Sequence, residues 1–254
     1  MMNPVIVRNI KIGEGIPKIC VPIVGITAEE IINEAKSFAK IPVDIVEWRA
    51  DWYENVFQFD KVKVILEKLR NVLGETPILF TFRTAKEGGE KEIPEDVYLA
   101  LNCMVAETKQ ADMIDVEIFL QEQTVKGIIE TAHRNGITVV ASNHDFEKTP
   151  EQKEIVFRLI KMQDMGADIL KMAVMPRSKK DVITLLAATE EMTTNYAKQP
   201  VVTMSMSGKG VISRLTGEVF GSAMTFGAAK KASAPGQIPV GELEKILDIL
   251  HKSL

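Results

Sequence analysis

The chain has 254 residues, a length that suits one α/β barrel of about 250 residues. Apolar residues make up 46% of it and the net charge is −4, so no basic surface indicates a nucleic acid partner. Its longest apolar runs are too short to cross a bilayer and its first residues lack a signal peptide pattern, which predicts a cytoplasmic protein with no membrane partner.

Short apolar, β-branched runs alternate along the chain with longer segments of helical period. Residues 5–12, followed by Gly13 and Gly15, predict a small hairpin. The segments that follow are predicted, in chain order, as strand 18–24, helix 28–39, strand 43–49, helix 62–72, strand 77–83, helix 95–110, strand 112–117, helix 123–135, strand 137–144, helix 152–165, strand 167–172, helix 179–196, strand 200–205, helix 211–215, strand 219–225 and helix 240–250. Each of these eight units takes about 30 residues, the size of one βα step.

Eight strand–helix units predict the α/β class and a closed (β/α)8 TIM barrel with a short N-terminal β-hairpin, rather than an open doubly wound sheet. No linker or change of composition divides the sequence, so we expect residues 1–254 to form a single barrel domain that carries catalysis. In such barrels the functional side chains lie at the carboxyl ends of the strands, where the βα loops converge.

Cysteine and histidine are scarce in this chain. Cys20 and Cys103 have no partner at the spacing of metal ligands, and neither does any of the three histidines. We therefore expect reduced thiols and an enzyme that uses no metal ion and no cofactor.

Lys171 follows an apolar strand pattern that begins at Gly166, and more apolar residues come after it. Burial disfavours the charged form of an amine, and a neutral amine can attack a ketone to form an imine. His144 ends the preceding predicted strand and could act as a general acid and base. Taken alone, Lys171 is better interpreted as a strand-end lysine that extends to water, so the prediction of imine chemistry depends on its neighbours.

Other polar side chains stand at the ends of the predicted strands. They are Glu47, Arg49, Arg83 and Glu87, which follows shortly after Arg83. Arg214 follows the glycines at positions 208 and 210. The guanidinium of Arg214 suits a carboxylate, which makes an acidic substrate plausible, although a surface arginine would fit this segment equally well. Met204 and Met206 alternate along a predicted strand and so share one face, where they could belong either to the core or to the lining of a pocket.

Residues 227–239 are rich in small side chains. This composition suits a lid that closes over the barrel, but a passive connection could have the same composition.

Taken together, the segments 47–49, 81–84, 142–146, 171–173, 204–207 and 233–238 resemble type I 3-dehydroquinate dehydratase. The resemblance covers nearly the whole chain, beginning at Ile12. It implies a homodimeric (β/α)8 barrel of the shikimate pathway, which dehydrates 3-dehydroquinate to 3-dehydroshikimate by syn elimination through a lysine Schiff base. It leaves open whether the chain serves biosynthesis or the breakdown of quinate.

The resemblance also implies a role for each matching residue. Lys171 would form the imine with the C3 ketone, His144 would move a proton from C2 to the departing C1 hydroxyl, and Glu87 would orient His144. The residues implied to bind substrate are Glu47, Arg49 and Arg83 around the ring hydroxyls, Arg214, Ser233 and Gln237 near the carboxylate and the lid, and Met204, Met206 and Phe226 as apolar lining. One position departs from the family: Pro22 stands where many members carry a serine.

Two other interpretations remain at this point. A class I aldolase shares the barrel and the lysine imine, but it breaks a C–C bond and usually takes a phosphorylated substrate. The weak phosphate signal and the pairing of His144 with Glu87 favour elimination. A barrel kept as a binding module would form no imine with any keto acid.

Overall fold

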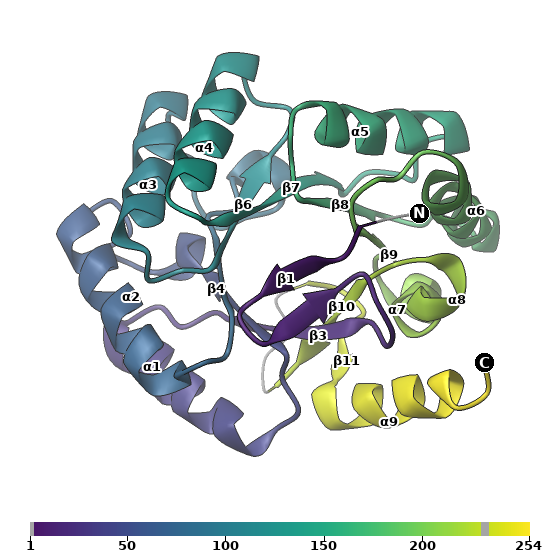
Figure 1. Ribbon diagram of the computed structural model, residues 1–254, viewed down its shortest axis with the longest axis horizontal. Coiled ribbons are helices and arrows are strands. Elements are labelled where there is room, and N and C mark those ends of the chain that lie inside the picture. Colours follow the sequence, from purple (N-terminus) through teal and green to yellow (C-terminus); the bar gives the residue numbers. More distant parts are fainter. Residues whose placement is uncertain (1–2, 230–233) are drawn as a thin grey trace.

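The computed structural model describes residues 3–229 and 234–254, and Figure 1 views it from the end that the N-terminal hairpin covers. The parallel strands of the described chain are β3 (Lys18–Ile23), β4 (Ile45–Arg49), β5 (Ile78–Thr81), β6 (Met113–Glu117), β7 (Thr138–Asp145), β8 (Ile169–Val174), β9 (Val201–Ser205), β10 (Met224–Ala228) and the two-residue β11 (Ile238–Pro239). Each of β3 to β8 pairs with the next strand along the chain, and β10 pairs with both β3 and β11. The amide of Ala223 donates to the carbonyl of Val201, which joins the two ends and closes the barrel.

Helices cover the outside of the barrel all the way round (Figure 1). They are α1 (Ala28–Ser37), α2 (Phe59–Leu73), α3 (Glu95–Thr108), α4 (Glu122–Arg134), α5 (Gln152–Asp164), α6 (Lys179–Asn195), α7 (Val211–Leu215), α8 (Gly217–Phe220) and α9 (Val240–His251). Two of them begin with a capping box, formed by Thr27 with Glu30 and by Ser178 with Asp181. These caps fix the points where the chain leaves the carboxyl ends of β3 and β8. The predicted (β/α)8 barrel is confirmed.

One predicted strand was wrong in its first half. Residues 219–225 were expected to form the last strand, but Val219 and Phe220 belong to α8 and the strand begins at Met224. The β-branched and aromatic side chains suggested a strand, whereas the local backbone continues the turn of α7. Gly221 then ends α8 with a φ of +92°, a left-handed conformation that glycine adopts readily.

The barrel interior changes from apolar to charged along the strands. Near their amino ends, the inward-facing side chains form an apolar layer that includes Cys20, Ile45, Leu79, Met113, Val140, Ile169 and Val202. Two residues further along, the same face of four strands carries Glu47, Thr81, Asp115 and Lys171. The period of two therefore places the charged layer directly above an apolar floor.

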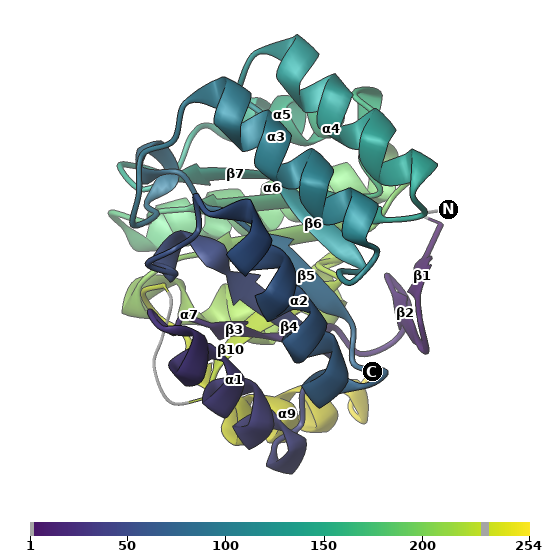
Figure 2. The same cartoon turned by 90° about the vertical axis from the view of Figure 1, so that its left-hand side faces the viewer.

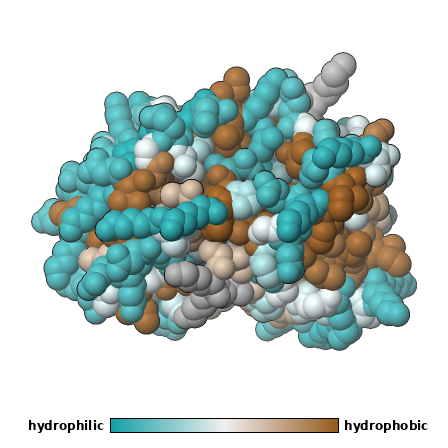
Figure 3. Space-filling model, turned by 90° about the horizontal axis from the view of Figure 1, so that it is seen from below, coloured by the Kyte–Doolittle hydropathy of each residue, from teal (hydrophilic) through white to brown (hydrophobic). Residues whose placement is uncertain are grey.

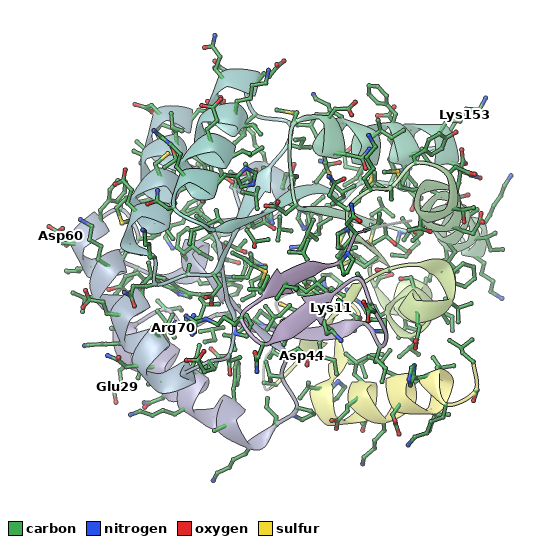
Figure 4. All side chains as sticks on the ribbon, in the orientation of Figure 1. Lys11, Glu29, Asp44, Asp60, Arg70 and Lys153 are labelled. Atoms are coloured by element: carbon green, nitrogen blue, oxygen red, sulfur yellow. The ribbon has the colours of Figure 1, made fainter. Side chains whose placement is uncertain are left out.

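The hairpin of β1 (Val5–Val7) and β2 (Ile10–Ile12) closes the amino-terminal end of the barrel, on the right in Figure 2. Its Val7 and Ile12 are buried in the apolar floor. Arg8 and Arg70 both form ion pairs with Asp112, which ties the hairpin to the rim; Figure 4 labels Arg70 beside the hairpin. A pocket in the barrel can therefore open only at the carboxyl ends of the strands.

Candidate active site

A pocket of about 480 Å³, counting its opening to solvent, lies at the carboxyl ends of the strands. Its lining contains eleven of the twelve residues predicted from the sequence, namely Glu47, Arg49, Arg83, Glu87, His144, Lys171, Met204, Met206, Arg214, Phe226 and Gln237. The twelfth, Ser233, lies outside the described residues. Pro22 is buried in β3, in register with Glu47 of β4.

Lys171 is held inside the barrel rather than at a strand end. The sequence predicted that its strand stops at residue 172, but the apolar run continues and β8 extends to Val174. The side chain is only 4% exposed. Its Nζ lies 3.1 Å from Oδ2 of Asp115, 3.6 Å from Oε1 of Glu47 and 4.7 Å from the centre of the Phe226 ring. The amine is therefore buried between two carboxylates and does not extend from a strand end into solvent.

His144 and Glu87 form a largely buried pair on the pocket wall. Nδ1 of His144 lies 2.9 Å from Oε2 of Glu87, and the backbone N–H of His144 donates to the same oxygen. Nδ2 of Asn143 donates to the other oxygen of Glu87 at 3.0 Å. These contacts fix the plane of the carboxyl group, and the contact at Nδ1 leaves Nε2 as the ring nitrogen available for a ligand.

The environment changes the protonation of both partners. Burial, together with the nearby Glu117 carboxylate, raises the pKa of Glu87 to about 8, although Arg83 opposes this effect. Burial, with the charges of Arg83 and Lys171, lowers the pKa of His144 well below its ordinary value. Near neutral pH the imidazole is therefore neutral and the Glu87 carboxyl keeps a proton. Such a pair can exchange protons with a ligand at little energetic cost.

Arg83 and Arg49 are buried and satisfied by carboxylates. Nη2 of Arg83 donates to Asp115 at 2.6 Å, and its Nη1 donates to Glu117 at 2.9 Å. Although burial alone would lower the pKa of Arg83, these carboxylates raise it well above its ordinary value. Arg49 makes a two-pronged contact with Asp51, with both distances 2.8 Å. Both guanidinium groups therefore stay charged in fixed positions on the pocket wall.

Arg214 differs from the other two arginines. It is 2% exposed, yet within residues 3–229 and 234–254 no carboxylate lies within ion-pair distance of it. Its Nη2 donates to the carbonyl of Pro235 at 3.1 Å, and its Nε has no hydrogen-bond partner. Burial lowers its pKa to about 10, so the group is still a cation at neutral pH. A buried cation without a counter-ion, facing a pocket, is suited to an anionic ligand.

Sequence reasoning missed several residues of this site. Phe146 and Ala173 line the pocket, and Asp115 and Glu117 lie beneath it as partners of Lys171 and Arg83. A usable signal was present: Asp115 and Glu117 are two positions apart in an otherwise apolar strand, which places both on one face. Two carboxylates on the inner face of a buried strand require cations opposite them.

The fold and the pocket together define a class of (β/α)8-barrel enzyme in which a buried lysine, a histidine–carboxylate pair and an arginine without a described carboxylate partner face one cavity. The model of the family described as type I 3-dehydroquinase matches residues 19–254, and the chain belongs to this family. Membership favours elimination over the aldolase chemistry that the residues alone left open.

Curated relatives and solved structures agree with this assignment. A 3-dehydroquinate dehydratase of Clostridium botulinum is 56% identical over 254 residues, covering 100% of both chains. One of Listeria monocytogenes is 57% identical over 251 residues, covering 99% of each. A crystal structure of the type I enzyme from Clostridium difficile, described with covalent modified comenic acid, has a TM-score of 0.97 and 52% identity, covering 100% of this chain and 99% of that one.

Proposed function

We propose that this chain dehydrates 3-dehydroquinate to 3-dehydroshikimate in the shikimate pathway, through an imine on Lys171. The observation that carries the proposal is the buried amine of Lys171 in one pocket with the His144–Glu87 pair and with Arg214, which has no described carboxylate partner. An imine makes the neighbouring C–H bond more acidic. The reaction therefore needs a nucleophilic amine, a group that transfers protons and a group that binds the substrate. The pocket provides one candidate for each.

The reaction sequence follows from these positions. The neutral amine of Lys171 adds to the C3 ketone, and loss of water with uptake of one proton gives an iminium. Nε2 of His144 then takes the C2 proton, and the electron pair moves into the iminium. When this pair returns, the C1 hydroxyl leaves with the proton from His144 as water. A second water hydrolyses the imine, which frees the amine and releases 3-dehydroshikimate.

Glu87 orients His144 and controls which nitrogen carries its proton. When Glu87 is ionised, Nδ1–H of His144 donates to Oε2, and Nε2 is left free to act as a base. When Glu87 is protonated, it donates to Nδ1 and the ring proton moves to Nε2. The state of Glu87 therefore determines whether the histidine presents a base or an acid to the substrate.

The remaining predicted residues are proposed to bind the substrate. Arg214 and Gln237 hold its carboxylate, with Ser233 joining them from the segment 227–239, which we propose acts as a lid. The described part of this segment supports the idea, because Gln237 lines the pocket and the carbonyl of Pro235 accepts hydrogen bonds from Arg214 and from the amide of Ser207. We propose that Glu47, Arg49 and Arg83 bind the hydroxyl groups of the substrate ring. The side chains of Met204, Met206 and Phe226 would form the apolar wall that limits water near the imine.

The test has two parts. 3-Dehydroquinate is added to the protein while the ultraviolet absorbance of the conjugated enone product is followed. Borohydride is then added during turnover, and the labelled peptide is identified by mass spectrometry. We expect the enone to appear and the label to lie on Lys171. A label on the exposed Lys209 in its place would reject the mechanism, and absence of the enone would reject the function.

We also propose that the chain forms a homodimer, as the family resemblance implies, and that it is located in the cytoplasm, as the sequence predicts. None of the described helices is long and apolar enough to span a membrane. On the face shown in Figure 3, apolar side chains gather at the right, where α8 and the end of α9 lie. Exposed apolar residues of these elements and of α7 are Ile212, Val219 and Ile249. Sedimentation of the wild type and of Val219→Lys would test whether a second copy covers this face.

A further inference from the structure

Asp115 lies in the middle of β6, directly beneath the pocket. It is completely buried, and the described hydrogen bonds of its carboxylate all involve residues at the pocket floor. Its Oδ2 accepts from Nζ of Lys171 at 3.1 Å, and its Oδ1 accepts from Nη2 of Arg83 and from Oγ of Ser142, both at 2.6 Å. It does not line the pocket, so it reaches a ligand only through Lys171 and Arg83, which do.

These contacts fix the charge of Asp115. Burial alone would raise the pKa of its carboxyl group, but the charges of Arg83 and Lys171 lower it below its ordinary value. The group is therefore an anion throughout the neutral range. It is also immobile, because hydrogen bonds hold both oxygens and the barrel encloses it. The closest approach of Glu47, the other carboxylate near Lys171, is longer at 3.6 Å.

We propose that Asp115 is the fixed counter-ion of the Lys171 nitrogen, which holds the ammonium in the free enzyme and stabilises the iminium once substrate is bound. The inference rests on the proposed imine chemistry. The same nitrogen carries the positive charge before the amine loses its proton and again after the carbinolamine loses water. Asp115 faces that nitrogen from below in both states, whereas the substrate approaches from the pocket. It is a positioning residue that acts through Lys171.

This role predicts two opposite effects of Asp115→Asn. Without the anion, the ion pair that holds the Lys171 nitrogen is lost, so the amine should react faster with a small electrophile. The iminium loses its counter-charge at the same time, so less of it accumulates with substrate. General damage to the pocket would make both reactions slower, and the pair of readouts therefore separates an electrostatic role from a structural one.

The experiment uses the full chain as wild type, Asp115→Asn and Ser142→Ala. The Ser142 variant removes a hydrogen bond to the same carboxylate but leaves its charge. Carbamylation of Lys171 by cyanate is measured without substrate, relative to the exposed Lys153, by peptide mass spectrometry. The fraction trapped by borohydride is measured with saturating 3-dehydroquinate.

For Asp115→Asn we expect carbamylation to rise about 10-fold or more and the amount of trapped imine, relative to unmodified Lys171, to fall by a similar factor, the change that ~1.4 kcal/mol produces. Ser142→Ala should change the carbamylation of Lys171 and the amount of trapped imine by less than about 3-fold each, well below the ~10-fold change expected for Asp115→Asn. Unchanged or slower carbamylation in Asp115→Asn overturns the proposal. Absence of trapping in the wild type would instead reject the proposed function, while the cyanate reaction would still report on Asp115.

If Asp115→Asn is too unstable to measure, the double variant Asp115→Asn, Lys171→Met removes both charges of the pair. Removing one partner of a buried ion pair is more damaging than replacing both. The double variant should therefore unfold at a higher denaturant concentration than Asp115→Asn. Equal instability of the two would overturn the pairing.

Discussion

Replacing Arg214 with methionine separates the energetic cost of burying this cation from its use in binding. Methionine has a similar length and no charge, so it fills the same space among Met204, Pro235 and the pocket. We expect the variant to bind substrate much more weakly and to be more stable than the wild type. The two effects have one origin, because the guanidinium is buried without a described counter-ion.

The expected gain in stability follows from the protonation of Arg214. Its pKa falls from the ordinary value to about 10 through burial, which corresponds to ~3 kcal/mol against the charged form in the folded protein. Below pH 10 the group is charged in both the folded and the unfolded chain, so this penalty is fully present at neutral pH. Loss of the hydrogen bond from this charged group to Pro235 offsets about 1.5–3 kcal/mol of the gain. The net gain of up to about 1.5 kcal/mol would raise the Tm by up to roughly 6 °C.

The binding effect has the opposite sign. Loss of a charged hydrogen-bond partner costs about 1.5–3 kcal/mol, which would raise the KM for 3-dehydroquinate roughly 10- to 100-fold. Thermal melting and steady-state kinetics measure the two effects, with Lys209→Met as the control because Lys209 is an exposed cation just before α7. A substrate analogue that lacks the carboxylate should bind the wild type and Arg214→Met about equally well. If the variant is less stable, or loses affinity for that analogue too, Arg214 has a structural role and the reasoning fails.

Four further outcomes test the other residues. Lys171→Ala should abolish turnover and lower the free energy of unfolding by roughly 3–5 kcal/mol in urea, because two buried carboxylates lose their cation; residual turnover would exclude it as the nucleophile. His144→Ala should lose at least ~10²-fold in kcat while borohydride still traps imine, and a loss of only a few-fold would remove it from the mechanism. The kcat/KM of the wild type should rise with pH through about 8 as Glu87 ionises, and Glu87→Gln should abolish that rise; a flat wild-type profile would contradict the assignment. Gln237→Ala should raise KM roughly 2- to 10-fold with little change in the imine, and an unchanged KM would exclude it from binding.

The fold and most of the pocket could be predicted because both depend on local sequence patterns. Alternating apolar strands and amphipathic helices specify the barrel, and polar residues at the strand ends mark its functional rim. The boundaries of the last strand were not predictable in this way, because Val219 and Phe220 have strand propensity but lie in α8. There, the helical continuation from α7 outweighs the preference of single residues.

Ion-pair partners were the other part that sequence patterns did not provide. Lys171 and Asp115 are 56 positions apart. They come into contact only because both side chains point into the barrel, one from β8 and the other from β6. The burial of Arg214 depends likewise on Pro235, which is 21 positions away. A pattern along the chain identifies which face of a strand a residue occupies, whereas its partner depends on the closed barrel. Local reasoning therefore found the reactive groups and missed the charges that control them.

The arrangement of these charges gives the pocket a direction. Lys171 and Arg83 both form ion pairs with buried carboxylates on the floor and share one of them, Asp115, whereas Arg214 has no described carboxylate partner at the rim. An anionic group on a ligand is attracted to Arg214 and repelled from the floor, where negative charge is already present. A carboxylated ketone therefore enters with its carboxylate toward Arg214, and its uncharged carbonyl is the end that can approach Lys171. The same asymmetry opposes the reverse orientation, because that would place a carboxylate beside Asp115 and leave Arg214 unpaired. We infer that the ion pairs beneath the pocket select the binding orientation as well as the charge of the nucleophile.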